Sequence, residues 1–328
     1  MPQASFGFVG MGKETVPGTG VAPTSFIPVK DANFMLDPAY YQFREIIGSR
    51  SAYQSHPGVL ASNIQFSSTV YPQRYLVDIL QGLFGDFVQS VPEAGAFKYT
   101  FAEAATLPSW SFERSDTQNN TGLIHERTAG VKIESVGFTA AVGEEVTMNV
   151  RGQGLGAPVD PAAHPGAFTY PTMDPFTFVN ATVEVDGVAS NIVRSMDIEF
   201  TNVLQPQAAL RGHLGGTMAR TPFRIYEGGL SCTMRASTIF DDATFYTLFQ
   251  NATEFSVELL FQGGVIGATA ENYELSLLFE KVKASGFDSP MRAGEILEAD
   301  LDFEISYDRE NSRLGVFYVQ GDEDGTTW

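Results

Sequence analysis

Apolar and polar residues alternate with a period of two along much of this chain. Between residues 194 and 201, Met196, Ile198 and Phe200 fall on one face of an extended backbone, and the residues between them are polar. The same pattern recurs in residues 300–307. Such alternation predicts strands with one buried face and one solvated face.

Turn residues between alternating runs predict antiparallel hairpins. Residues 136–150 contain two such runs around a turn at Gly143. A second hairpin is predicted for residues 301–307 and 314–319, which flank the polar turn 308–312. We therefore expect antiparallel sheets to dominate the fold.

Two segments have instead the spacing of a helix that buries one side. Their apolar stripes are Leu76, Ile79, Leu80 and Leu83, and Phe245, Leu248 and Phe249. Pro72 suits the first turn of the first helix, and Asp241 or Asp242 can cap the second. A short helix packed on a sheet is the simplest arrangement that buries such a stripe.

Short matches recur in order along the chain at a nearly constant separation. Residues 67–71 match 236–240 and residues 150–152 match 319–321, both 169 apart, and residues 6–9 match 176–179, 170 apart. These matches predict a duplicated domain. Two copies are too few for a solenoid, which needs about three or more. A duplicated chain instead suits a subunit that occupies two equivalent places in a ring.

A proline-rich segment separates the two predicted copies. Residues 154–175 contain five prolines, and proline at this density predicts an extended linker. The predicted fold is therefore mainly β, with two tandem β-sandwich or barrel domains, each with one flanking α-helix. The first domain covers residues 1–153 and includes an N-terminal arm, and the second covers residues 176–328.

Composition favours a globular protein that does not bind nucleic acid tightly. The chain has 39 acidic and 20 basic residues, a formal net charge of −19, whereas binding to a phosphate backbone depends on clustered Lys and Arg. The N-terminus has no signal-peptide pattern, and no apolar run approaches the ~20 residues of a membrane span. We expect a soluble protein made in the cytoplasm, without membrane contact.

No arrangement of residues predicts catalysis, a metal or a cofactor. Residues 7–14 resemble a phosphate-binding loop, but Glu14 stands where Ser or Thr would bind magnesium. The four histidines are dispersed, and the adjacent acids fit turns, a helix cap and a tail better than a calcium loop. The single cysteine, Cys232, excludes a disulfide within the chain and is expected to be a small core residue. We therefore predict that the protein is not an enzyme.

Two segments, 12–38 and 114–128, are predicted as long loops because they lack an evident period. Loops of this length inside compact domains are usually functional or disordered. In a ring-forming protein, the functional option is an arm that reaches a neighbouring subunit. The candidate arm residues are Arg114, Asn119, Asn120 and Thr121.

The segment 12–24, with the sequence GKETVPGTGVAPT, resembles the opening of tail tube (major tail) proteins of long-tailed bacteriophages. Those proteins begin with Gly-x-Glu-Thr-x-x-Gly-Thr-x-x-x-Pro-Thr before their first strand. The resemblance implies tail-tube-type domains whose sheets join those of neighbouring subunits around a lumen, with six domains in a ring. A chain with two domains would then form a homotrimeric ring.

The resemblance also implies a place in the virion tail and no catalytic residue to transfer. The expected partners are further copies of the chain, the tape-measure, tail terminator and distal tail proteins, and DNA that passes without being bound specifically. Assembly is expected in the host cytoplasm.

The acidity of the chain fits a lumen that repels the DNA backbone. The candidate lumen-facing residues are Ser195, Asp197, Glu199, Thr201, Asp300, Asp302 and Glu304. An ordinary solvent-exposed outer face is the alternative for these residues.

The competing function is a two-domain β-sandwich binding module, or another virion component, that binds a receptor or carbohydrate. It would need an exposed aromatic platform. The candidates for one, Trp110 with Phe112 and the terminal Trp328, form only a weak pattern.

Overall fold

The computed structural model describes residues 7–43, 54–117, 124–161, 168, 170–171, 173–209, 220–241, 244–291 and 297–323. As predicted, the fold is mainly β, with antiparallel strands and two short α-helices. The elements of the first half are β1 (Phe8–Lys13), β2 (Ser25–Ile27), β3 (Val29–Phe43), β4 (Gln54–Thr69), α1 (Arg74–Phe84), β5 (Gly85–Glu93), β6 (Ala96–Glu103), β7 (Trp110–Ser115), β8 (His125–Ala141) and β9 (Thr147–Gly154).

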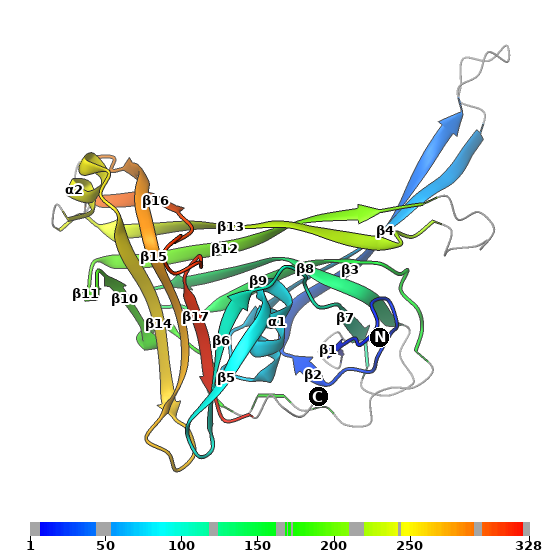
Figure 1. Ribbon diagram of the computed structural model, residues 1–328, viewed down its shortest axis with the longest axis horizontal. Helices are drawn as coiled ribbons and strands as arrows, with labels where there is room; N and C mark the ends of the chain where they lie inside the picture. Colours follow the sequence, from blue (N-terminus) through cyan, green and yellow to red (C-terminus); the bar gives the residue numbers. More distant parts are fainter. Residues whose placement is uncertain are drawn as a thin grey trace.

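The second half continues with a 3-10 turn, Phe178–Asn180, and ends in a strand that returns to the first half. Its elements are β10 (Ala181–Val185), β11 (Val188–Ser190), β12 (Val193–Gln207), β13 (Arg224–Ile239), α2 (Thr244–Asn251), β14 (Phe255–Val265), β15 (Asn272–Asp288), β16 (Glu298–Ile305) and β17 (Val316–Gly321). Figure 1 shows β12 and β13 crossing the molecule, while the β3–β4 hairpin projects at the upper right.

The strand pairings of the first half recur in the second half in the same order. β1–β2, β1–β7, β3–β4, β4–β9, β7–β8 and β8–β9 correspond to β10–β11, β10–β14, β12–β13, β13–β16, β14–β15 and β15–β16. The two helices also correspond, since α1 contacts β8 and α2 contacts β15. The two halves therefore follow one topology.

Bulges mark the correspondence to the residue. The β3–β4 ladder has irregularities after Val29 and after Pro38, and the β12–β13 ladder has them after Val193 and after Asn202. Both pairs of positions are 164 residues apart. Because a bulge is a specific local feature of a strand pair, its repetition at matched positions is strong evidence for one shared pattern.

The separation between equivalent residues is not constant, in contrast to the prediction. Arg74 and Thr244 begin the two helices 170 residues apart, whereas the bulges after Ile133 in β8 and after Ala284 in β15 are 151 apart. The difference arises because the β5–β6 hairpin lies between α1 and β7, while α2 leads directly to β14. The match of residues 150–152 with 319–321 is therefore wrong, since β9 corresponds to β16.

The predicted hairpin between residues 301–307 and 314–319 is also wrong. β17 pairs with β15 and with β6, and β16 pairs with β13 and β15. Phe317 and Val319 are 3% and 1% exposed, so β17 buries its apolar face between the two halves. Alternation identified the strand but carried no information about its partner.

The two predicted loops are largely strands. Residues 12–38 contain the end of β1, all of β2 and the first part of β3, and residues 114–128 contain the end of β7 and the start of β8. Short strands joined by turns have too few residues for a period to emerge.

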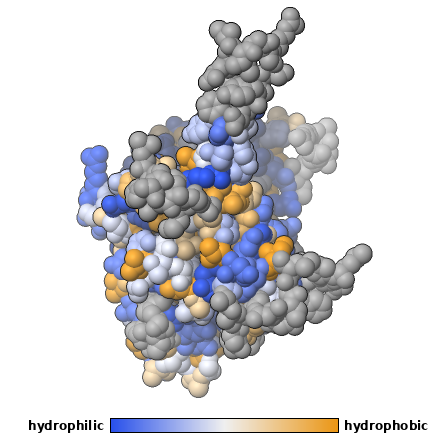
Figure 2. Space-filling view, turned by 90° about the vertical axis from the view of Figure 1, so that its right-hand side faces the viewer, coloured by the Kyte–Doolittle hydropathy of each residue, from blue (hydrophilic) through white to orange (hydrophobic). Residues whose placement is uncertain are grey.

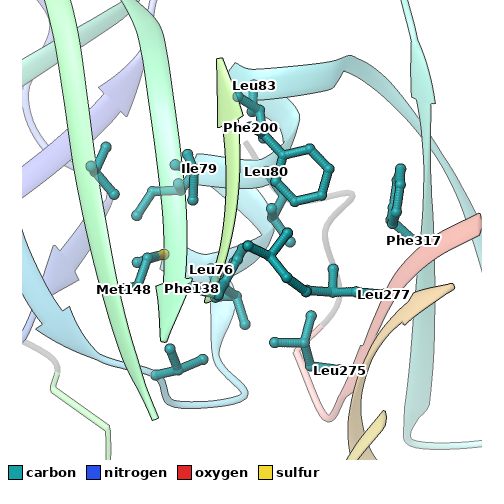
Figure 3. Close-up of a cluster of buried hydrophobic side chains, with 14 of the residues drawn as sticks. Leu76, Ile79, Leu80, Leu83, Phe138, Met148, Phe200, Leu275, Leu277 and Phe317 are labelled. Carbon is teal, nitrogen blue, oxygen red and sulfur yellow. The ribbon is translucent and has the colours of Figure 1, made fainter. Parts of the chain in front are cut away.

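The two halves share one core as well as one hydrogen-bonded sheet. β8 pairs with β12, and β6 pairs with β17. Figure 3 shows Leu76 and Leu80 of α1 beside Phe200 of β12 and Leu277 of β15. The division into domains at residues 153 and 176 stays a prediction, since backbone pairing and apolar packing continue across both halves.

The N-terminal motif is built around a buried carboxylate. Glu14 Oε1 accepts hydrogen bonds from Ser111 Oγ at 2.7 Å and from the backbone N–H of Gly130 at 2.8 Å. Its Oε2 accepts one from the N–H of Gly18 at 2.8 Å, and Gly18 has a φ of +83°. A Cβ on Gly12 would lie 2.5 Å from the carbonyl oxygen of Ala22. The motif is therefore structural, and the phosphate-loop likeness has no functional meaning.

We predict that Glu14→Ala lowers the free energy of unfolding by about 3 kcal/mol or more, because three donors lose their acceptor in a buried place. Glu14→Gln, which keeps one acceptor oxygen, is expected to lose less. Urea unfolding followed by circular dichroism measures both. Glu144→Ala, at an exposed turn, is the control and should change stability by no more than about 0.5 kcal/mol. Equal stability of Glu14→Ala and wild type would contradict the structural role.

A second carboxylate is buried in α1. Asp78 accepts a hydrogen bond from Ser25 Oγ, and Arg74 Nε lies 3.8 Å from its Oδ2. Burial raises the pKa of Asp78 to about 6, although Ser25, Arg74 and Lys13 oppose the shift. The raised pKa means that the folded state holds this proton more tightly than the unfolded state does.

We predict that Asp78 makes the protein less stable as the pH rises from about 4 to above 6. Over that range the unfolded chain has already lost the proton that the folded chain keeps, so ionisation favours unfolding. A shift from 3.8 to about 6 corresponds to about 3 kcal/mol. In Asp78→Asn, the decline in unfolding free energy between pH 4 and pH 7 should be smaller by up to this amount. Parallel pH profiles for wild type and variant would refute the assignment.

Candidate functional site: a polar sheet face and two open strand edges

Eight strands form a continuous sheet that runs through both halves of the chain. In hydrogen-bonded order they are β3, β4, β9, β8, β12, β13, β16 and β15. Alternate residues on one face are buried in the core, among them Phe34, Phe66, Val150, Phe138, Ile198, Met234 and Phe303. The other face is polar.

The predicted lumen-facing residues all lie on this polar face. In the β12–β13–β16 ladders, Asp197, Arg235 and Asp302 stand side by side, as do Glu199, Thr233 and Glu304. Ser195 and Asp300 flank Ser237 in the next row, and Thr201 lies between Ser135 and Ser231. The structure therefore gathers residues that are about a hundred positions apart in the sequence.

The polar face is acidic and hollowed. The predicted rows contain Asp197, Glu199, Asp300, Asp302 and Glu304. Arg235 Nε lies 2.9 Å from Asp302 Oδ1, and both side chains are more than half exposed, so this pair contributes little to stability. A groove of about 540 Å³ lies along strands β8, β9, β12 and β13 of this face.

Both ends of the eight-stranded sheet are open edges within the described residues. β3 pairs with β4 and with no other described strand. Residues 283–288 of β15 pair with β16 on one side only. An open edge is a template for pairing with another chain.

The β3 edge is the functional feature that sequence reasoning missed, because this segment was assigned to a loop. The signal was present in the alternation of Ala32, Phe34 and Leu36 with Asn33 and Met35. In the structure, Phe34 is 6% exposed, whereas Leu36 is 42% exposed although it lies on the same face.

The candidate arm residues are only partly described. Arg114 lies on β7, where its Nη2 is 2.9 Å from Glu126 Oε2 and its guanidinium stands over the ring of Phe34. The assignment of Arg114 to a loop is therefore wrong, because it is held in the β7–β8 hairpin. Asn119, Asn120 and Thr121 lie outside the described residues.

Other chemistry finds little support in the structure. Trp110 and Phe112 are both 0% exposed, so they cannot form a platform for sugar stacking. Desolvation raises the pKa of the Cys232 thiol, which keeps it protonated. Among the described residues, no group of three or more His, Cys, Asp and Glu could hold a metal ion. No helix in the described part of the chain is long and apolar enough to cross a membrane.

Comparison with known proteins identifies the family. A search of curated proteins finds no match. The model of the family described as phage tail tube protein matches residues 7–305 of the 328, a range that contains β1 to β16 and therefore nearly all of both halves. The chain belongs to the phage tail tube protein family.

Proposed function

We propose that three copies of this chain form each ring of a phage tail tube, and that rings stack head-to-tail into a conduit for DNA. Family membership makes the chain a structural component of the virion tail that assembles with itself, a role that is not enzymatic. The number of chains in a ring, the lining of the lumen and the passage of DNA are the parts that we propose.

The junction between β8 and β12 is the observation that supports a trimer. It joins two matched sets of four strands, β3–β4–β9–β8 and β12–β13–β16–β15, into one sheet. Three chains would supply six such sets. The outer edges of this unit, β3 and β15, correspond to the two strands that meet at the internal junction. A contact between unlike surfaces can close into a ring and so remove open edges.

The polar face is the better candidate for the lumen. The opposite face is covered by α1 on β8, by α2 on β15 and by the β1–β2–β7 strands. In a closed ring, the outer side has the larger circumference and can hold these additional elements. The exposed carboxylates would then face the DNA and repel its phosphates.

The remaining expectations rest on the family. We propose that the tube contacts the tape-measure, tail terminator and distal tail proteins, and that it assembles in the host cytoplasm. Residues 119–121 stay candidates for an arm to a neighbouring subunit. A receptor-binding or carbohydrate-binding module has no observation in its favour, since its main aromatic candidates are buried.

We predict that purified protein forms stacked rings, each with three chains and six similar lobes. Cryo-electron microscopy gives the lobes, and the mass per unit length gives the number of chains. Rings with six complete chains would rule out the trimer, and protein that stays monomeric at high concentration would count against the proposed function.

We predict that Asp197→Lys with Glu199→Lys converts the lumen from one that repels DNA into one that retains it. Both side chains are exposed, so the folded subunit should be unaffected. Tubes assembled with short duplex DNA are treated with nuclease, and the protected DNA is measured. The variant should protect DNA at low salt and release it as salt is raised.

The matched control is Asp160→Lys with Glu310→Lys, which makes the same change of charge at exposed residues outside the polar rows. These tubes should protect no more DNA than wild type. DNA that binds to the Asp197 and Glu199 variant but is digested would show that the polar face lies outside the tube.

A further inference from the structure

We propose that each ring closes through an intermolecular copy of the β8–β12 junction, in a defined register. The end of β15 and the residues after it, 286–291, would add antiparallel to the open edge of β3 of a second copy, residues 32–37. Leu36 would then stand opposite Phe287, and Ala32 opposite Met291. This inference rests on the proposed function and adds the interface and its register.

The register follows from the repeated bulges. Residues of β12 correspond to residues of β3 that precede them by 164, from the irregularities after Val193 and Val29. Residues of β15 correspond to residues of β8 that precede them by 151, from the bulges after Ala284 and Ile133. The β7–β8 and β14–β15 ladders give the same 151 through Val131 and Val282, which pair at equivalent bulges.

The internal junction shows what the intermolecular junction would bury. On its apolar face, Phe200 stands opposite Val136, Ile198 opposite Phe138, and Met196 opposite Ala140. All six side chains are buried, with at most 8% exposed. The two shifts convert these pairs into Leu36 with Phe287, Phe34 with Ser289, and Ala32 with Met291.

The exposed apolar residues at the open edges are those that would lack a neighbour in the isolated chain. Leu36 is 42% exposed, whereas its counterpart Phe200 is 0% exposed. Met291 is 88% exposed, whereas its counterpart Ala140 is 8% exposed. Figure 2 shows hydrophobic surface on the side of the molecule from which the β3–β4 hairpin projects. A second copy of the chain supplies the partner that each edge lacks.

A groove beside β3 is shaped to receive Met291. It has a volume of about 610 Å³, and its apolar lining includes Val9, Ile27, Val29 and Ala32. The corresponding place in the second half is lined by the counterparts Val183, Ser190, Val193 and Met196, and there Ala140, Ala141 and Val142 of β8 reduce the open volume to about 150 Å³. The larger groove is therefore the same site without its β8-like strand.

Pro290 limits what else could pair with the β15 edge. It falls opposite Asn33 in this register and has no N–H to donate. Proline at an edge makes indiscriminate backbone pairing less favourable. Recognition would then depend on the apolar contacts of Phe287 and Met291, which only a matching groove provides.

Disulfide trapping tests the register in assembled tubes. In a Cys232→Ala background, Ala32→Cys with Met291→Cys and Met35→Cys with Asp288→Cys place cysteines directly opposite each other across the junction. Opposite residues in an antiparallel pair have Cα atoms about 4.5–5.5 Å apart, which a disulfide can span. The control, Ala32→Cys with Ser289→Cys, is displaced by two residues.

After oxidation, denaturing electrophoresis without reductant should show linked dimers and closed trimers for at least one of the opposite pairs. The displaced control should link at least tenfold less. Tubes that form without any linkage of the opposite pairs, or equal linkage of the control, would overturn the register. A ladder that continues to six chains would support the junction but reject the trimeric ring.

A second variant covers the case in which the cysteine variants do not assemble. Met291→Asp places a charge in the apolar groove, and we expect the concentration needed for assembly to rise at least tenfold while the circular dichroism spectrum is unchanged. Val88→Asp, at a residue that is 67% exposed on β5, is the control and should assemble normally. Normal tubes of Met291→Asp would overturn the junction alone, whereas wild-type protein without any tubes would refute the proposed function as well.

Discussion

The backbone pairing of β8 with β12 is the constraint on which the rest of the structure depends. It joins Ser135 through Ala141 to Ser195 through Thr201 and so makes two sets of four strands into one sheet. Phe200, directly on this ladder, contacts the rings of Phe84 from α1, Phe279 from β15 and Phe317 from β17 at centroid distances of 5.3, 5.9 and 5.2 Å. Helix, sheet and final strand therefore meet at one aromatic residue, and the halves cannot separate without exposing it.

The elements that the two halves do not share are also informative. The β5–β6 hairpin has a place in the first half only, and β17 joins it to β15 of the second half. These strands lie away from the eight-stranded sheet, so the sheet can repeat while the outer layer does not. A ring built from three chains would then have six similar positions inside and three distinct ones outside.

The sequence was sufficient to predict the strands and the helices, but not how the strands pair. Alternation in residues 194–201 and 300–307 predicted β12 and β16 with the correct solvated face, because which face is buried is a local property. The partner of a strand is set by distant residues. The separation of 169 therefore led to β17 as the counterpart of β9, whereas the repeated bulges show that the counterpart is β16.

The same limit applies to the candidate site. The acidic residues of β12 and β16 could be chosen from the sequence, but not the fact that Asp197 and Asp302 flank the same residue, Arg235, on β13. β3 was missed because its start is broken by a bulge after Val29, which shifts the alternation by one residue. Asn119, Asn120 and Thr121 lie outside the described residues, so their expected role stays a prediction.

One strand has to meet two opposite demands in such a tube, and the period of two makes this possible. A chain with a net charge of −19 repels its own copies, and a closed lumen would concentrate the field of the carboxylates on the polar face. The residues that would seal the junction, Leu36 and Phe287, lie on the opposite face of the same strands from Asp197 and Asp302. Apolar burial is not weakened by salt, whereas repulsion between solvated carboxylates is screened beyond about 10 Å at 0.1 M salt. Assembly of a highly acidic subunit is therefore compatible with a lumen that repels DNA.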